Sequence, residues 1–428
     1  MKKYISSLCL VLAWLLAACA VLPPAVTTEP IPTDDVQIQT SIPPVTSLPT
    51  ETVLPTETIL PTETVIPTET VLPTETVRPT ETLPPPSSVP GMERYLLSFA
   101  GDCTFGDNIN NTSFDGVFSQ VVGDNFAYPF ANVLQYFGSD ELTLVNLECA
   151  LTTYEPTEEE ILDLKLHEKT FRFRTDPKYV QVLTAGSVEA VSAANNHSTD
   201  FGWPGHKETR EVLKNAGIRY ATWGSNSLIQ TPNGLVIGIY ANQFRGIKEK
   251  EIQANVEKLR SQGAQIVICS FHWGVERAYM PNEDQQNLAH AAIDAGADIV
   301  FGHHPHVLQP MEIYNGGLIL YSMGNFSFGG NRNPADRDTA IIQQEIIRYP
   351  DGSVVMGETI IIPCCLSSKK SGNNFQPTPY TPGSSGYNRV MSKLDWSYAD
   401  QWQAEQDAAT APTETVPPTQ TTGSTETT

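Results

Sequence analysis

Residues 299–306 read Ile-Val-Phe-Gly-His-His-Pro-His, an apolar run that stops at a group of imidazole side chains. A short apolar run bounded by glycine is typical of a buried strand. In α/β folds, ligands bind beyond the carboxyl ends of the strands. His303, His304 and His306 stand at that place, so this stretch predicts a strand of an α/β fold with a binding site at its end.

The same alternation of apolar runs and segments of helical period continues in both directions. Strands are predicted at 95–100, 142–146, 188–193, 235–240, 265–270, 299–302, 317–321, 339–347 and 354–362. Helices are predicted at 177–185, 204–216, 248–262 and 282–295, the last three followed by glycine, a common stop signal. Apolar strands that alternate with helices predict a sheet buried on both faces. If these strands lie side by side in one parallel sheet, their end loops meet at a single rim.

Side chains able to bind a metal follow five of these strands. The loops read Gly101-Asp102, Asn146-Leu147-Glu148, Asn195-Asn196-His197, His272-Trp273-Gly274 and Gly302-His303-His304-Pro305-His306. Five of the eight histidines fall in three of these short loops, which favours a metal site over scattered surface or core histidines. A mixed nitrogen and oxygen shell suits manganese, iron or zinc better than calcium.

Six motifs in order carry a family resemblance over roughly residues 93 to 365. They are Ser98-Phe99-Ala100-Gly101-Asp102, Val145-Asn146-Leu147-Glu148, Ala194-Asn195-Asn196-His197, His272-Trp273-Gly274-Val275-Glu276, the 302–306 stretch and Tyr321-Ser322-Met323-Gly324-Asn325-Phe326. The chain resembles the bacterial capsule-synthesis CapA family, which is associated with poly-γ-glutamate and looks like a branch of the calcineurin-like metallophosphoesterases. The resemblance implies a sandwich of two β-sheets flanked by helices (α/β/β/α) and one or two divalent metal ions.

The resemblance also implies residue roles. Metal ligands would be Asp102, Glu148, Asn196, His272, His304 and His306. Substrate contacts or supporting positions would be Asn146, Asn195, Glu276, His303 and Asn325. His197 would be a general acid oriented by Asp200, or else a hydrogen-bonding neighbour of the metal ligands.

Two positions depart from the metallophosphoesterase pattern. Thr104 stands where a histidine is expected two residues after Asp102, which weakens one metal position. A bridging aspartate is expected where this chain offers Asn146 and Glu148; Glu148 is favoured because a carboxylate can span two cations. Burial is favoured over metal binding for Cys103 and Cys149, since side chains alternate along an extended chain.

Several functions stay open from the sequence. The first is a metal-dependent hydrolase or transferase of poly-γ-glutamate capsule synthesis, export or anchoring. Its expected partner is an anionic extracellular polymer or its precursor, and membrane capsule-synthesis proteins are expected as further partners. The alternatives are a non-catalytic, metal-stabilised module that binds or tethers the polymer, and a secreted metallophosphoesterase. Fold resemblance alone does not decide among them. A net charge of -22 excludes nucleic acid as the main partner, and a polyanion would need metal or local bases such as Arg172, Arg174, Arg245 and Arg277.

The ends of the chain predict export and attachment to a membrane. Residues 1–18 have a positive start and an apolar run typical of a signal peptide, and Leu16-Ala17-Ala18-Cys19 resembles a lipobox, so Cys19 is the expected lipidation site. The alternatives are an ordinary secretory signal and an uncleaved anchor. A stalk with Pro-Thr-Glu-Thr repeats at a period of six is predicted at 19–91, the folded domain at 92–400 and a disordered Thr-rich tail at 401–428. The expected location is the extracytoplasmic face of the cell membrane.

Overall fold

A computed structural model of the protein describes residues 90–109, 117–243 and 247–398. The predicted signal peptide, Cys19, the C-terminal tail, Arg245 and nearly all of the stalk lie outside these residues. Within the described ranges, no helix combines the length and apolar character needed to cross a bilayer.

The first sheet has eight strands and carries the N-terminal half of the site. Its order is β16-β15-β14-β1-β2-β5-β6, and β13 pairs with the end of β1. β1, β2, β5, β6 and β13 run parallel, whereas β14, β15 and β16 are antiparallel neighbours. The bounds are β1 Glu93–Thr104, β2 Leu142–Leu147, β5 Ala190–Ser192, β6 Arg219–Ala221, β13 Asn325–Phe328, β14 Asp338–Arg348, β15 Val354–Cys365 and β16 Thr378–Pro379.

The second sheet has six strands in the order β11-β12-β10-β9-β8-β7. Its four central strands are parallel, and antiparallel strands close both edges. The bounds are β7 Ser227–Gln230, β8 Val236–Gln243, β9 Ile266–His272, β10 Ile299–His303, β11 Met311–Tyr314 and β12 Gly317–Leu320. A separate short pair joins β3 Ala150–Leu151 to β4 Arg174–Thr175.

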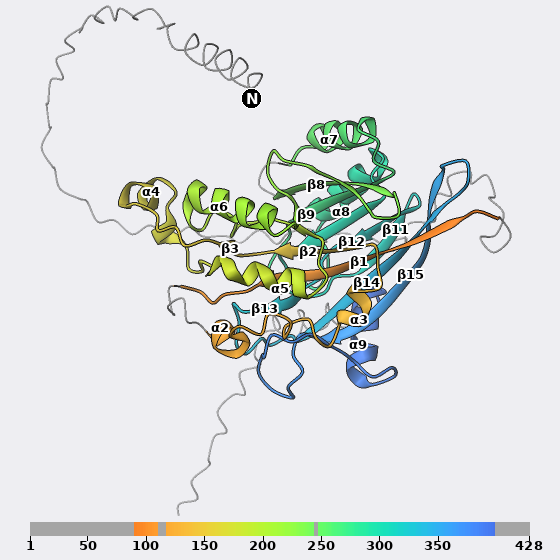
Figure 1. Cartoon of the computed structure of the whole chain (residues 1–428). Coiled ribbons are helices and arrows are strands. Elements are labelled where there is room, and N and C mark those ends of the chain that lie inside the picture. Colours follow the sequence, from red (N-terminus) through yellow and green to blue (C-terminus); the bar gives the residue numbers. More distant parts are fainter. Residues whose placement is uncertain (1–89, 110–116, 244–246, 399–428) are drawn as a thin grey trace, which may run out of the picture. The chain divides into compact units, whose positions relative to one another are not determined.

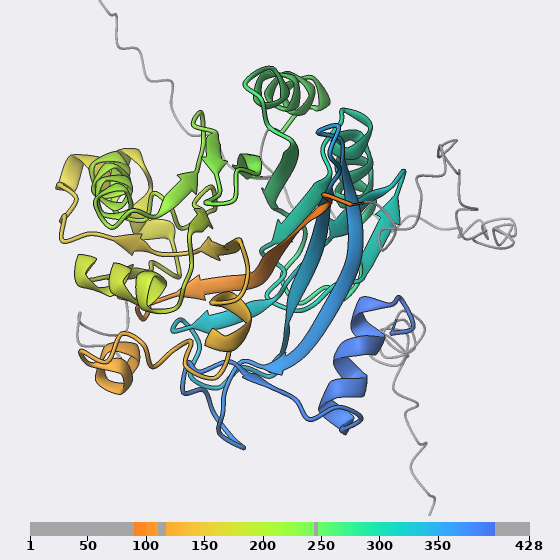
Figure 2. The same ribbon diagram turned by 45° about the vertical axis from the view of Figure 1, so that its right-hand side comes forward.

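Helices cover the outer faces of both sheets (Figure 1). The α-helices of the described residues are α2 Val117–Val122, α3 Leu134–Phe137, α4 Glu158–Asp163, α5 Val180–Ala185, α6 Gly202–Asn215, α7 Glu249–Ser261, α8 Glu283–Asp294 and α9 Ser385–Leu394. α9 differs from the others, because its Val390 and Leu394 pack into the core between the sheets. Residues of α5 and α6 pack on the first sheet, and residues of α7 and α8 pack on the second. Figure 2 shows α5 and α6 on one side of the strands and α7 and α8 on the other.

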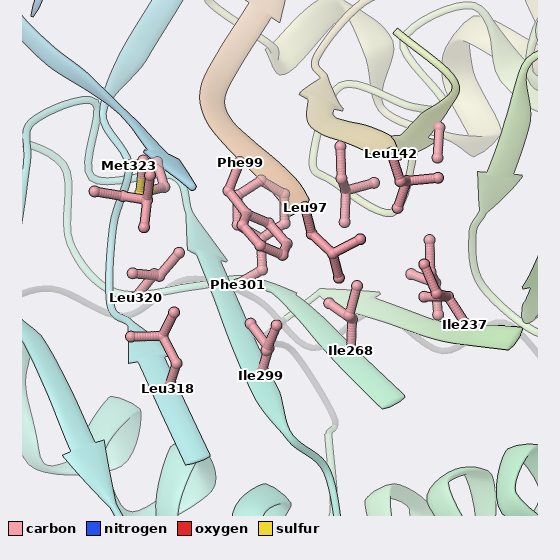
Figure 3. Packing of buried hydrophobic residues seen from close by; sticks show 14 of the residues in the cluster. Leu97, Phe99, Leu142, Ile237, Ile268, Ile299, Phe301, Leu318, Leu320 and Met323 are labelled. Atoms are coloured by element: carbon pink, nitrogen blue, oxygen red, sulfur yellow. The ribbon is translucent and has the colours of Figure 1, made fainter. Parts of the chain in front are cut away.

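The two sheets face each other across an apolar core. Leu97 and Phe99 of β1 point toward Ile268 of β9 and Phe301 of β10 (Figure 3). The rings of Phe99 and Phe301 are 5.3 Å apart between centroids, and both are fully buried. The predicted α/β/β/α sandwich is therefore confirmed.

The nine predicted strands and four predicted helices are all present, with shifted ends. The strands that precede the predicted loops do not all lie in one parallel sheet. β1, β2 and β5 belong to the first sheet and β9 and β10 to the second, so the predicted loops meet where two sheet ends converge. Apolar runs do not encode which sheet a strand joins, because strands of both sheets are equally buried.

Candidate metal centre

The first sheet brings oxygen atoms to the site. Asp102 lies near the end of β1, Asn146 lies in β2 and Glu148 follows β2, and all three side chains are fully buried. Asn146 Nδ2 donates to Asp102 Oδ1 at 2.9 Å, and Asn195 Nδ2 donates to Asn146 Oδ1 at 3.1 Å. This chain of amides fixes the Asp102 carboxylate. The Glu148 side chain lies beside it and is fully buried.

The loop after β5 adds the only imidazole from the first sheet among the predicted site residues. His197 Nδ1 lies 2.8 Å from Asp200 Oδ2, and His197 Nε2 lies 3.9 Å from Glu148 Oε1. The backbone N–H of His197 donates to Asn195 Oδ1 at 3.1 Å. One ring nitrogen is thus held by a carboxylate while the other faces the centre of the site.

Lys169 and Phe173 hold Asp200 in turn, and sequence reasoning missed both. Lys169 Nζ donates to Asp200 Oδ1 at 2.6 Å, and the backbone N–H of Phe173 donates to Asp200 Oδ2 at 2.7 Å. The Phe173 ring lies 4.4 Å from the His197 ring. These residues lie in the connection between α4 and α5, which carries no apolar pattern that marks it as part of a site.

The second sheet brings imidazoles. His272 ends β9, His303 ends β10, and His304 and His306 follow in the next turn. His304 Nδ1 lies 3.1 Å from His272 Nε2, and His306 Nδ1 lies 3.0 Å from Asn325 Oδ1. His304 and His306 have φ values of 97° and 58°, a left-handed backbone that is costly for residues other than glycine. That backbone turns both rings toward the carboxylates.

The carboxylates and imidazoles of the two sheets meet at short range. Asp102 lies 3.0 Å from His303 Nδ1 and 3.2 Å from His306 Nδ1. Glu148 Oε1 lies 3.6 Å from His272 Nε2 and 3.8 Å from His306 Nε2. Three triads could each hold a cation, with all ligand atoms within 4.8 Å of one another: Glu148, His272 and His304; Asp102, Glu148 and His306; and the more exposed Glu276, His304 and His306.

One connection sets the spacing between the two sheets at this end. Residues 321–324 link β12 of the second sheet to β13 of the first. A Cβ at Gly302 would lie 2.1 Å from the Tyr321 carbonyl oxygen, and a Cβ at Gly101 would lie 2.0 Å from that of Gly324. Only glycine allows such an approach, so the strands before Asp102 and His303 both press against the same short segment.

Buried atoms without partners test whether a cation fits. In the described part of the chain, Asp102 Oδ2, both carboxylate oxygens of Glu148, and Asn196 Oδ1 are buried without a hydrogen bond. His306 Nδ1 is near Asp102 Oδ2 but is no hydrogen-bond partner of it. Buried polar atoms are normally satisfied, and an unpaired buried carboxylate is costly. This oxygen-rich set beside imidazoles fits a divalent transition metal.

The pKa values reflect the crowding of these groups. Burial opposes ionisation of Asp102, yet the imidazoles of His303 and His306 hold its pKa well below the usual range. Burial and the Asp102 carboxylate raise the pKa of Glu148 well above its ordinary value. Burial lowers the pKa of His272 and of His304, whereas for His306 the Glu148 and Asp102 carboxylates outweigh burial and raise the pKa to about 10.

The remaining predicted residues fall at or beside the site. His303 is fully buried against Asp102, and Asn325 also donates through Nδ2 to the His306 carbonyl at 3.3 Å. Glu276 is exposed at the rim. Thr104 Oγ1 donates to the Glu148 carbonyl at 3.1 Å, so the threonine that replaces the expected histidine supports the Glu148 backbone. Cys103 and Cys149 are buried, as predicted, and Trp273 is buried as well.

Two of the four bases proposed to offset the acidic body, Arg172 and Arg174, are already engaged. Arg172 Nε donates to the Asp200 carbonyl at 3.0 Å, and Arg174 pairs with Glu155 at 2.6 Å. Both guanidinium groups lie over the Phe201 ring, 4.6 and 4.5 Å from its centroid. They brace the loop that carries His197 and Asp200.

The two-sheet sandwich, with carboxylates and imidazoles at the converging sheet ends, is a metallophosphoesterase-like fold. Residues 96–330 match the family model of the bacterial capsule synthesis protein PGA_cap. The chain belongs to this family, and it is CapA-like.

Named relatives share this region. The chain is 32% identical over 278 residues to the PGA biosynthesis protein CapA of Bacillus subtilis, covering 60% of this chain and 68% of the relative. It is 30% identical to the capsule biosynthesis protein CapA of Bacillus anthracis, covering 51% of this chain and 58% of the relative. It is also 30% identical to a probable polyglutamine synthesis accessory protein of Mycobacterium tuberculosis, covering 43% and 55%.

Proposed function

We propose that this protein is a metal-dependent hydrolase or transferase of poly-γ-glutamate capsule synthesis that acts on the polymer or its precursor. The observation that carries the proposal is the set of buried oxygens of Asp102, Glu148 and Asn196 that accept no hydrogen bond and lie opposite the imidazoles of the second sheet. Family membership and the names of the relatives supply the substrate class.

The proposed ligands are Asp102, Glu148, Asn196, His272, His304 and His306, for one or two ions of manganese, iron or zinc. A divalent cation held there would polarise a substrate oxygen and lower the pKa of water. Asn146 and Asn195 orient Asp102 through the amide chain, and His303 and Asn325 pack against Asp102 and His306.

His197 is the proposed general acid. Its Nδ1 is held by Asp200, so Nε2 faces the centre and can hold the proton that a departing group receives. Asp200 accepts from Lys169 as well, which keeps that carboxylate fixed. Such proton transfer typically contributes about 10²- to 10⁴-fold to a rate.

The proposed setting is the outer face of the membrane. The lipobox-like Leu16-Ala17-Ala18-Cys19 supports a lipid anchor, and the repeats of the stalk support a spacer that carries the folded domain away from the bilayer. Replacement of Cys19 by serine should release the protein from membranes into the medium. Retention of the variant on membranes would argue against lipidation.

A metal-stabilised tether without turnover is the second candidate, favoured by Thr104 in place of a histidine. The deciding experiment measures metal content of the purified full chain by elemental analysis, then assays the metal-loaded and chelated protein on γ-linked glutamyl chains and on phosphodiesters. Cleavage or transfer of glutamyl chains that chelation abolishes supports the proposal. Bound metal with no activity on either substrate supports the tether, and activity on phosphodiesters alone supports a secreted phosphoesterase.

A further inference from the structure

A pocket of about 340 Å³ lies at the far edge of the first sheet, apart from the metal centre. It is lined by Arg337, Cys365, residues 367–370 and residues 378–380. Arg337, Lys369 and Lys370 give this lining three positive charges and no carboxylate. We call this group of residues the basic pocket.

The positive charges of the basic pocket are not neutralised nearby. The adjacent carboxylates have cations of their own: Asp338 pairs with Arg389 at 2.6 Å and with Lys393 at 2.8 Å, and Asp336 pairs with Lys393 at 2.7 Å. Among the residues that the structure describes, neither Lys369 nor Lys370 forms an ion pair, and both are exposed.

The backbone around these lysines is held in place. Arg337 Nη1 donates to the Lys370 carbonyl at 2.7 Å, Nη2 donates to the Lys369 carbonyl, and the buried Arg337 Nε has no partner in the described residues. Asn373 Nδ2 donates to the Phe328 carbonyl at 2.8 Å, and the Phe328 ring lies 5.2 Å from the His306 ring. The loop that carries the lysines is therefore tied to the wall of the metal centre.

The basic pocket opens at the same end of the sheet as the metal centre. Phe99 of β1 pairs with Ile342 of β14, and beyond this pair β13 lies beside β1 in place of β14, since Asp102 pairs with Asn325. Thr339 pairs with Cys364 of β15, and Cys364 pairs with Pro379 of β16. From β1 the path crosses β13, β14, β15 and β16, and four strand spacings of about 4.8 Å separate the two places by roughly 19 Å. An extended chain of about six residues spans that distance, since even an α-linked residue reaches about 3.5 Å.

We propose that the basic pocket is a subsite that holds carboxylates of a γ-linked glutamyl chain while another part of the same chain occupies the metal centre. The inference rests on the proposed function for its substrate class. Lysine ammonium groups on flexible stems suit a row of carboxylates without fixed orientation, because each acts as a point charge. The guanidinium of Arg337 is occupied by backbone carbonyls, so the pocket offers no bidentate fork for a phosphate.

The test compares three forms of the full, metal-loaded chain: wild type, Lys369→Gln with Lys370→Gln, and Lys250→Gln with Lys258→Gln. The last pair is the matched control, because both lysines are exposed on α7 beside the second sheet. Binding of a labelled γ-linked glutamyl decamer is measured by fluorescence anisotropy at low ionic strength. We expect about three- to tenfold weaker binding for the 369/370 variant and unchanged binding for the control.

Equal affinity of the wild type and the 369/370 variant would overturn the inference, as would equal weakening by the control. Tighter, lysine-dependent binding of inorganic polyphosphate than of the decamer would overturn the carboxylate assignment. A γ-glutamyl dipeptide is too short to span the metal centre and the basic pocket, so its turnover tests the metal centre alone. This assay separates the two proposals. Lysine-dependent binding without turnover of any glutamyl chain supports the subsite and contradicts the enzyme, whereas turnover with lysine-independent binding does the reverse.

Discussion

The two sheet ends that form the metal centre differ in chemistry. The first sheet supplies carboxylates and amides through Asp102, Glu148 and Asn196, and the second supplies imidazoles through His272 and the 304/306 pair. Two of the three triads that could hold a cation combine ligands from both ends. The apolar packing of Phe99 against Phe301 therefore does more than stabilise the fold, because it also brings the two halves of a ligand set together.

His197 is the exception to this division, since it is an imidazole from the first sheet. Of the proposed substitutions, its replacement should have the largest effect, and that effect is on turnover. We expect His197→Ala to lower turnover about 10²- to 10⁴-fold through loss of the general acid, with metal content unchanged. His167→Ala is the matched control, because His167 is exposed. Unchanged turnover of the His197 variant would remove this residue from the mechanism.

Loss of the contact between Phe99 and Phe301 should lower the free energy of unfolding. We expect Phe301→Ala to lower the free energy of unfolding by about 3–5 kcal/mol, since it leaves a cavity between β1 and β10. Metal affinity should fall as well, because the same contact aligns the two ligand groups. Urea denaturation and a chelator competition measure the two effects. The half-exposed Ile360 is the control, and its change to alanine should cost less than about 0.5 kcal/mol.

Loss of one ligand from either sheet should weaken metal binding to a similar degree. Asp102→Asn and His272→Gln should each weaken metal binding by at least about tenfold to a hundredfold, since even neighbours of metal ligands have effects of that size. Competition with a chromogenic chelator measures the affinities, and His290→Gln, whose ring pairs with Glu312 away from the site, is the control. Full affinity in either variant would mean that one sheet holds the ion without the other.

The smallest expected effect is on the pH dependence of stability, and it comes from a histidine outside the metal centre. Burial lowers the pKa of His206 on α6 to about 4, so between that value and the unfolded pKa near 6.5 the unfolded chain binds more protons. Stability contributed by neutral His206 is present above pH 6.5 and is lost as the pH falls. From pH 7 to 5.5 the loss should be about 1 kcal/mol. Urea titrations of the wild type and His206→Gln measure it; an equal pH dependence in both would contradict this account.

Much of this could be predicted from the sequence, because apolar strands and the polar residues just beyond them are local signals. The strands β1, β9 and β10 were found in this way, although each extends further than predicted at its carboxyl end, and so were the residues that meet there. The assignment of strands to two sheets could not be found from the residues, since burial is the same in both; only the resemblance implied it. Lys169 was missed because its contact with Asp200 joins a loop to a distant turn. The strand β13 was missed because Asn325 and Ser327 interrupt its apolar run.

The glycines at 101 and 302 have a consequence for the redesign of this protein. Both strands rest on the carbonyl groups of residues 321–324, so the gap between oxygen and nitrogen ligands is fixed by the thickness of a single peptide segment. Substitutions in residues 321–324 would then alter the preference for an ion of a given radius more readily than exchange of the ligands themselves.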